Sequence, residues 1–216
     1  MLKIRQFVFN FFSESTFIAY DSDSLEAIVI DPGMLDRAER DFFDKFIAEN
    51  NLGLTQIVNT HLHLDHCFGN NYVRDRYGVK IAASPADAFL GATFEEQVRK
   101  YIGDDEFDSR KIEIDIPLHE GDIIPVGQYK FHVIEVPGHS PGGIALYCPE
   151  YNCAFVGDSV FYGSVGRTDL PGGDGRTLID SVRSKILTLP DKTQLFPGHD
   201  RMTTVGHEKA SNPYLK

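Results

Sequence analysis

The chain has 216 residues, of which 42% are hydrophobic and 25% are charged, a balance typical of a soluble globular protein. Its formal net charge is −11, and its lysines and arginines form no basic stripe, so nucleic acid and anionic membrane surfaces are poor partners for it. No segment approaches the roughly 18 consecutive apolar residues that a membrane span needs, and we expect a cytoplasmic protein.

The first part of the chain alternates short apolar runs with turn residues. These runs predict strands at 4–9, 16–20, 27–30, 56–60 and 79–83. Apolar residues that recur on one face predict a helix from about residue 35 to 49, which Gly53 is placed to stop. A second helix is predicted at 69–77, closed by Gly78.

The rest of the chain has a different character. Residues 84–115 carry two short helical patterns and the acidic stretch 104–106, and we interpret them as an insertion or flap within the domain. Further strands are predicted at 129–136, 144–148, 154–156 and 194–196, with a helix at 177–188. Two batches of strands, each followed by a helix, predict one α/β domain over residues 1–216, with two packed sheets and helices outside.

The three cysteines, Cys67, Cys148 and Cys153, cannot all pair and lack the spacing of a secreted disulfide scaffold. Cys148 and Cys153 flank a four-residue turn and could face each other across a hairpin. The simpler interpretation is that they are small buried packing residues in a reducing compartment. For Cys67, which follows His66, packing is likewise favoured over a role as a ligand.

The densest group of metal-ligand residues contains His61, His63, Asp65 and His66. In an extended segment alternate side chains point the same way, so His61 and His63 face one point while Leu62 faces the core. Crowding three imidazoles and a carboxylate is unfavourable unless a cation uses them, and this donor set suits Zn²⁺, Mn²⁺ or Fe²⁺. The alternative is a polar, histidine-rich surface loop.

Three later turns also carry such a residue beside a glycine, directly after an apolar strand, and they contain His139, Asp158 and His199. A histidine-rich surface loop would not explain this repetition. Ligands at the ends of several strands, next to glycines that let the backbone approach closely, describe one site at the edge of a sheet. The sequence therefore predicts a metal site.

These motifs, in this order, resemble the metallo-β-lactamase superfamily. Residues 157–161 and 166–174 resemble the segment after the bridging aspartate in its glyoxalase II-like (hydroxyacylglutathione hydrolase-like) branch, and 203–214 resemble the ending of the short single-domain members. The resemblance spans nearly the whole chain. It implies an αββα sandwich, with two mixed sheets, helices on the outer faces and the site at one edge.

The resemblance also implies a role for each ligand residue. It assigns His61, His63 and His139 to a first metal, Asp65, His66 and His199 to a second, and Asp158 to a bridge between them. We expect two divalent ions, with zinc as the first choice and iron or manganese as alternatives.

Two further residues have more than one interpretation. Asp31 is either a residue that fixes the ligand loop from outside the centre or a plain turn aspartate before Pro32. Arg167 could meet a substrate carboxylate, or it could pair with Asp169 or Asp174 within its own loop. For Arg167 we favour the pairing within the loop.

The charge of the predicted centre indicates an anionic substrate, because two divalent ions, two aspartates and a bridging hydroxide leave a residual charge of about +1. We expect hydrolysis of a small anionic thioester, such as a hydroxyacyl-glutathione, with attack by the bridging hydroxide and Asp65 accepting its proton. A thiolate leaves at a pKa of about 8.5 and needs little assistance, which favours thioesters over amides.

Other activities stay open from the sequence. The ligand residues include, as a subset, the two histidines and one aspartate that hold iron in a persulfide dioxygenase. A lactonase or other ester hydrolase could use the same site. A non-catalytic metal-binding module is disfavoured, because such a protein would be expected to have lost some ligand residues. The expected partner is a small anionic molecule, and the oligomeric state is open.

Overall fold

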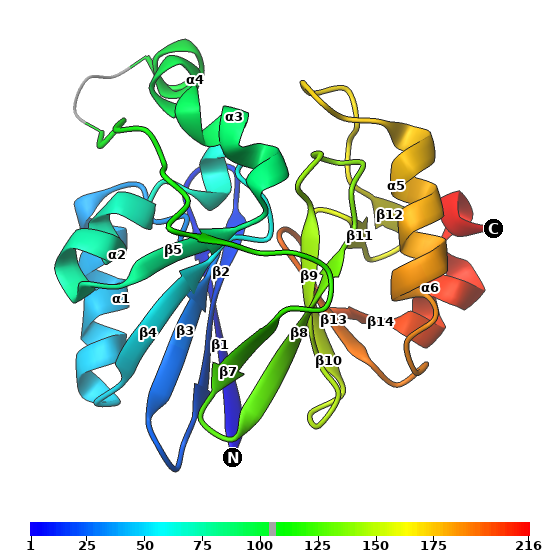
Figure 1. The fold of residues 1–216 in the computed structure, drawn as a ribbon, viewed down its shortest axis with the longest axis horizontal. Coiled ribbons are helices and arrows are strands. Elements are labelled where there is room, and N and C mark those ends of the chain that lie inside the picture. The colour runs from blue at the N-terminus through cyan, green and yellow to red at the C-terminus, as the bar shows by residue number, and fades with distance from the viewer. Residues whose placement is uncertain (104–106) are drawn as a thin grey trace.

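The computed structural model of the chain describes residues 1–103 and 107–216, so the acidic stretch 104–106 of the predicted insertion lies outside the described residues. Two large sheets pack face to face, and helices cover both outer sides (Figure 1). This architecture confirms the predicted αββα sandwich. Among the described residues, no helix combines the length and the apolar character needed to cross a bilayer.

The first sheet is mixed, with the strand order β1-β2-β3-β4-β5-β6 in the described part of the chain. Its first three strands pair antiparallel and the later ones parallel. Strand β2 is buried along nearly its whole length, as expected for a strand covered on both faces. The strands are β1 (Leu2–Phe9), β2 (Glu14–Asp21), β3 (Glu26–Ile30), β4 (Gly53–Val58), β5 (Lys80–Ala83) and β6 (Ile116–Pro117).

The second sheet has the order β14-β13-β10-β9-β8-β7 and is also mixed, since β10 and β13 pair parallel while the other neighbours pair antiparallel. Two short strands, β11 (Val160–Phe161) and β12 (Ser164–Val165), form a separate ribbon. The sheet consists of β7 (Ile123–Val126), β8 (Tyr129–Glu135), β9 (Ile144–Cys148), β10 (Cys153–Gly157), β13 (Gln194–Pro197) and β14 (Thr203–Thr204).

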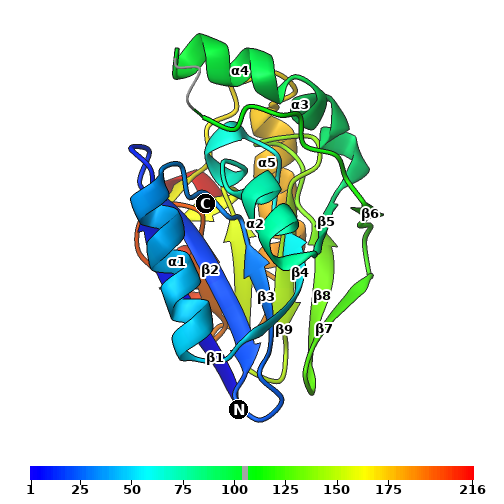
Figure 2. The ribbon, with the colours of Figure 1, turned by 90° about the vertical axis from the view of Figure 1, so that its left-hand side faces the viewer.

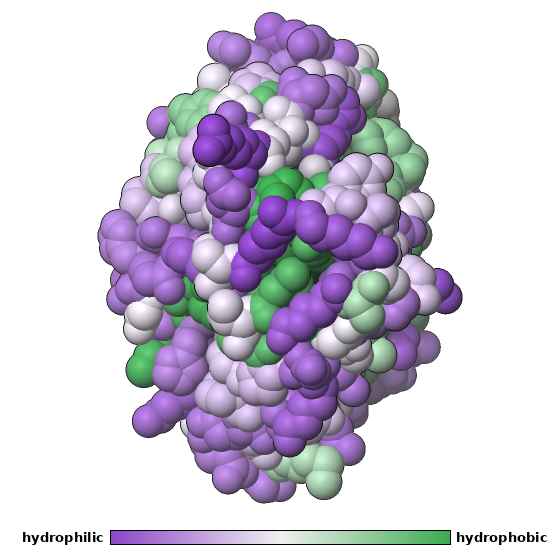
Figure 3. All heavy atoms as spheres, turned by 90° about the vertical axis from the view of Figure 1, so that its right-hand side faces the viewer, coloured by the Kyte–Doolittle hydropathy of each residue, from purple (hydrophilic) through white to green (hydrophobic). Residues whose placement is uncertain are grey.

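Helices α1 (Arg37–Glu49) and α2 (Asn70–Tyr77) cover the outer face of the first sheet (Figure 2). Helices α5 (Gly175–Ser181) and α6 (Val205–Ser211) cover the second, and the face on their side of the molecule is mostly hydrophilic, with a hydrophobic area near its middle (Figure 3). Helices α3 (Ala88–Ala92) and α4 (Phe94–Tyr101) lie at one end of the sandwich (Figure 2).

Three layers of apolar side chains hold the sandwich together. The middle layer lies between the sheets and includes Phe17, Phe131 and Phe155, whose rings are within 6 Å of a neighbouring ring. One outer layer packs α1 and α2 on the first sheet through residues such as Phe43, and the other packs α5 on the second sheet through residues such as Leu178. Burial of these faces leaves the strand ends and their loops free to build a site.

The prediction of one helix over 177–188 is partly wrong, because α5 ends at Ser181 and a π-helical turn follows at Val182–Ile186. The buried residues Leu178, Val182 and Ile186 recur every four positions, and the wider turn keeps them on one face. Gly53 does not stop the first helix but opens β4, since the helix already ends at Glu49.

Candidate metal centre

The predicted ligand residues lie in loops that follow strands of both sheets. His61 to His66 follow β4, His139 follows β8, Asp158 follows β10 and His199 follows β13. These strand ends meet at one edge of the sandwich, as the sequence predicted. The structure therefore brings together all seven predicted ligand residues from four separate loops.

Glycines allow this close approach. Gly157 has a φ of 49°, and a Cβ there would lie 2.3 Å from Thr60 Oγ1. A Cβ at Gly198 would lie 2.3 Å from Asp158 Oδ1 and 2.5 Å from His66 Cε1. Any larger residue at either position would push the loops apart.

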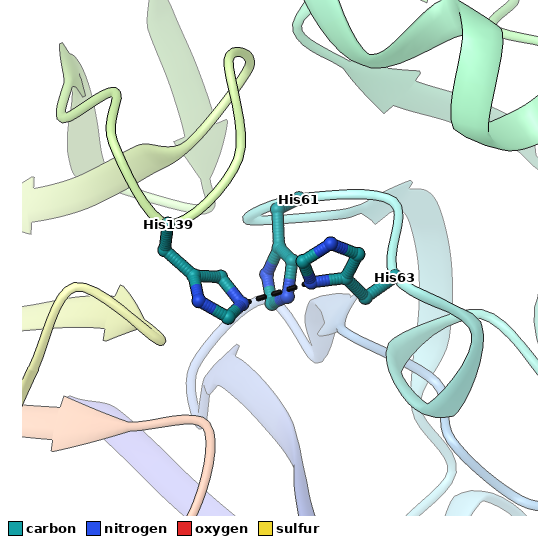
Figure 4. Close-up of side chains that lie close together, drawn as sticks. All are labelled: His61, His63 and His139. Atoms are coloured by element: carbon teal, nitrogen blue, oxygen red, sulfur yellow. Dashed lines mark hydrogen bonds between the residues drawn. The ribbon is translucent and has the colours of Figure 1, made fainter. Parts of the chain in front are cut away.

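The first histidine set consists of His61, His63 and His139, whose side chains point toward one another (Figure 4). His63 Nδ1 lies 2.8 Å from His139 Nε2. The ring centroids of His61 lie 4.8 Å from those of both His63 and His139. All three side chains are buried, and their ligand atoms lie within 4.8 Å of one another. This spacing allows one cation to contact three imidazoles.

The second ligand set consists of Asp65, His66 and His199. Asp65 Oδ2 lies 3.2 Å from His199 Nε2 and 3.7 Å from His66 Nε2. Asp158 lies between the two sets, with Oδ1 3.5 Å from His66 Nε2 and Oδ2 3.5 Å from His139 Nε2. One carboxylate thus faces both groups, which is the position a bridging ligand requires.

Several buried donor atoms of the ligand residues have no hydrogen-bond partner among the described residues. They are the Nε2 atoms of His61, His63 and His66 and the Oδ1 atom of Asp158, while the other ring nitrogen of His63, Nδ1, faces His139. An unpartnered buried polar atom costs about 1–3 kcal/mol, so a cluster of them is unfavourable without a ligand. Divalent cations that prefer nitrogen and oxygen donors fit this set.

The ring nitrogens on the opposite side do have partners. His61 Nδ1 lies 3.1 Å from Thr60 Oγ1, and His139 Nδ1 lies 2.7 Å from the backbone oxygen of Arg167. His66 Nδ1 lies 3.2 Å from Asp31 Oδ2. Such contacts fix the ring orientation and direct the free nitrogen toward the centre, as is usual for histidines that bind metals.

Asp31 contacts the ligand loop through both carboxylate oxygens. Thr60 donates its backbone N–H to Oδ1 at 2.7 Å and its hydroxyl to Oδ2 at 2.6 Å. Asp31 also lies close enough to His61 and His66 to share a cation with them. Because both oxygens already accept hydrogen bonds, the geometry favours the interpretation that Asp31 orients the loop.

Burial and neighbouring charges shift the pKa values of His61 and His63 in the opposite direction from the pKa of His66. Burial, together with the neighbouring imidazoles, lowers the pKa of His61 well below its usual value and that of His63 to about 4. Burial also opposes protonation of His66, but Asp65 and Asp158 raise its pKa well above the usual value. Burial would raise the pKa of both aspartates, yet the nearby histidines lower it, so both are ionised.

Sequence analysis missed two further buried carboxylates, those of Glu14 and Asp87. Glu14 Oε1 lies 3.9 Å from His66 Nδ1, and its Oε2 accepts a hydrogen bond from Thr16. Burial raises the pKa of Glu14 well above its usual value.

A cavity of about 700 Å³ opens onto the centre. Its walls come from the β1–β2 hairpin, from α3 and α4, from β11 and from the loop after β12. Wall residues include Phe12, Phe89, Lys100, Tyr101, Phe161 and Arg167. Arg167 makes the favoured pairing within its own loop, with Asp169 at 2.7 Å, and it also lines the cavity.

All three cysteines are buried and free. Cys148 and Cys153 are direct partners in the β9–β10 register, so they do face each other across the hairpin. Cys67 Sγ lies 3.6 Å from Asn59 Nδ2, and within the described residues it belongs to no ligand group. Its environment is that of a packing residue.

Comparison with known families gives the same answer as the geometry. The model of the metallo-beta-lactamase superfamily matches residues 10–199. The chain belongs to this superfamily. At the level of chemical class, it is a metal-dependent hydrolase of that group. The predicted resemblance is confirmed. The superfamily binds divalent metals, and the histidine-rich groups of this chain suit such ions.

Two curated relatives differ in activity. Hydroxyacylglutathione hydrolase GloC of Haemophilus influenzae is 35% identical over 209 residues, covering 94% of this chain and 93% of the relative. The human mitochondrial persulfide dioxygenase ETHE1 is 32% identical over 204 residues, covering 93% of this chain and 70% of the relative.

Two solved structures share the whole fold. The B3 metallo-beta-lactamase BLEG-1 superposes with a TM-score of 0.87 at 28% identity and covers 99% of this chain and 100% of its own. The protein TTHA1623, in a di-iron-bound form, has a TM-score of 0.84 at 31% identity and covers 98% of this chain and 100% of its own.

Proposed function

We propose that this chain hydrolyses a small anionic thioester, of the hydroxyacyl-glutathione kind, at a centre of two divalent metal ions. The observation that carries the proposal is the convergence of two ligand sets and Asp158 at the base of a 700 Å³ cavity. The similarity to hydroxyacylglutathione hydrolase GloC supports the substrate class.

In this proposal His61, His63 and His139 hold the first ion, and Asp65, His66 and His199 hold the second, with Asp158 contacting both. Zinc fits the imidazole-rich donor set, and iron is the alternative that the di-iron form of TTHA1623 supports. Bound divalent ions would supply an acidified water molecule and polarise a carbonyl oxygen.

Asp65 is the proposed proton acceptor. Its carboxylate lines the cavity, and the histidines around it lower its pKa against the effect of burial, so it is ionised and able to accept. His199 lies 3.2 Å from Asp65 Oδ2 and holds the side chain in place. The departing thiolate, with a pKa of about 8.5, needs little proton donation, which suits a site built around a base.

The walls of the cavity suit an anionic substrate with an apolar part. Lys100 and Arg167 supply positive charge in a chain whose net charge is −11. The Arg167 guanidinium is partly neutralised by Asp169, whereas the Lys100 ammonium lies over the Tyr101 ring at 4.8 Å. Phe12, Phe89 and Phe161 form apolar wall, a usual composition for small-molecule sites.

Iron-dependent persulfide dioxygenation is the second candidate, because a persulfide dioxygenase is 32% identical over nearly the whole of this chain. The same residues contain two histidines and an aspartate that could hold one iron ion. Hydrolysis of a lactone or another ester at the same centre is a third candidate.

One assay separates these candidates. Protein loaded with zinc or with iron is supplied with a hydroxyacyl-glutathione thioester, a lactone or glutathione persulfide, with and without O₂. We expect thiol release from the thioester that does not depend on O₂. Oxygen consumption that requires iron and the persulfide, without thiol release from the thioester, would instead assign the dioxygenase activity.

A further inference from the structure

Asp87 is a fully buried carboxylate that belongs to neither ligand set. It ends the 3₁₀ turn Pro85–Asp87, which follows β5 at the same edge of the sandwich as the metal centre. We propose that Asp87 is a positioning residue for the first histidine set, holding the loop of His61 and His63 against the loop of His139. The inference rests on the metal centre in the proposed function and not on the choice of substrate.

The carboxylate joins two loops that are distant in the chain. Its Oδ2 accepts the backbone N–H of Leu62 at 3.1 Å and the hydroxyl of Ser140 at 2.8 Å. Its Oδ1 accepts the backbone N–H of Gly142 at 2.6 Å. Leu62 lies between His61 and His63, and Ser140 directly follows His139. One side chain therefore contacts the immediate neighbour of every member of the set.

The loop that receives these contacts is tightly packed. A Cβ at Gly142 would lie 2.6 Å from Asp87 Cγ, so the carboxylate occupies the space that any other residue would need. Gly138 donates its N–H to the Ser140 oxygen at 2.9 Å, and Ser140 is fully buried. The loop thus has little freedom to move away from Asp87, and a shift of Asp87 would be transmitted to His139.

Asp31 shows what distinguishes this role from general stabilisation. Asp31 contacts His66 of the second set and also binds Thr60, whose hydroxyl lies 3.1 Å from His61 Nδ1 in the first set. Within the described residues, the Asp87 carboxylate accepts hydrogen bonds from the backbone and the hydroxyl that flank the first set alone. Variants of Asp31 should therefore weaken both metal ions, whereas variants of Asp87 should weaken the first ion selectively.

The test uses Asp87→Asn, which preserves size but replaces one acceptor oxygen with an NH₂ group that donates hydrogen bonds and cannot accept them. Metal-free protein is titrated with Co²⁺, and both dissociation constants and the visible spectra are recorded. Two single-set references, His63→Ala and His66→Ala, identify which spectral change belongs to which set. Asp44→Asn is the matched control, since Asp44 accepts hydrogen bonds from Tyr72 and Tyr77, both outside the ligand sets.

We expect Asp87→Asn to weaken Co²⁺ binding to the first set by about 10–100-fold, the range usual for partners of metal ligands. Binding to the second set and all parameters of Asp44→Asn should stay within about twofold of the parent. Equal weakening of both sets, or an unchanged first set, would overturn the proposal.

A second variant keeps the test decisive if Asp87→Asn does not fold. Ser140→Ala removes one of the three donors and leaves the carboxylate in place. We expect Ser140→Ala to weaken Co²⁺ binding to the first set alone, and by less than Asp87→Asn does. An unchanged first-set spectrum would overturn the proposal. Because the readout is Co²⁺ binding, a failed thioesterase assay would leave this result intact.

Discussion

His63 Nδ1 lies 2.8 Å from His139 Nε2, although 76 positions separate the two residues in the chain. Two imidazole nitrogens this close are stabilised only if one carries a proton, whereas a shared cation uses both lone pairs. Burial lowers the pKa of His63 to about 4, so its ring is neutral near pH 7 and one of its two nitrogens has a lone pair free for a cation. This contact is therefore the relationship on which the proposed centre most depends.

Replacing His63 with alanine should abolish turnover, because it removes one of three nitrogens from the first histidine set. We expect kcat/KM for the thioester to fall by more than about 100-fold, beyond the loss typical of residues that only orient ligands. His119→Ala is the control, since His119 is an exposed histidine outside both sets. Unchanged kcat/KM in His63→Ala would refute the assignment.

Chelation of the metal should remove activity without unfolding the chain, because the three apolar layers of the core do not include the ligand residues. We expect a lower unfolding temperature, since an ion present at 1,000 times its Kd stabilises the folded state by about 4 kcal/mol. Circular dichroism before and during heating measures the retained strand signal and the unfolding temperature. Zinc should restore the parent behaviour and magnesium should not, since magnesium prefers oxygen donors. A metal-free chain without strand signal would contradict this prediction.

The affinities of the chain for the two ions should depend differently on pH. In the metal-free protein the pKa values of His61 and His63 lie below the usual range, so those rings are already neutral and ready to bind near pH 7. The pKa of His66 is raised by Asp65 and Asp158 despite burial, so the second ion must displace a proton. Affinity for the second ion should therefore fall as the pH is lowered from about 8 to 5, and that for the first should change less. Calorimetric titration in two buffers of different ionisation enthalpy counts the released protons. Equal release at both steps would be the contrary result.

Phe155 should matter for stability and not for chemistry. It is fully buried between the sheets, with ring centroids 5.1 Å from Phe17 and 5.3 Å from Phe196. Phe155→Ala should lower the free energy of unfolding by about 3–5 kcal/mol, measured by urea denaturation of the metal-loaded protein. At temperatures where the variant is folded, kcat/KM should match the parent. Phe42→Ala, at a half-exposed position, should change the unfolding free energy much less.

Local patterns predicted most of the fold, because strands such as β9 and β10 are short apolar runs ended by turn residues. Strand β7 was missed because Pro125 interrupts its pattern, which an edge strand tolerates. The π-helical turn was missed because apolar residues four positions apart in the sequence are equally typical of an ordinary α-helix.

The ligand residues could be predicted because each one stands within two positions of a glycine or another ligand, after an apolar run. Asp87 and Glu14 could not, since a lone acidic residue carries no sign of the partners that folding brings to it. Asp87 is separated by 53 and 55 positions from Ser140 and Gly142. Such contacts depend on tertiary packing, which local sequence patterns do not encode.

The most direct test of the binuclear centre is anomalous X-ray diffraction from crystals of the zinc-loaded protein, recorded on both sides of the zinc absorption edge. We predict two anomalous peaks per chain, one contacted by His61, His63 and His139 and the other by Asp65, His66 and His199, with Asp158 reaching both. A single peak, or peaks bound by other residues, would contradict the account.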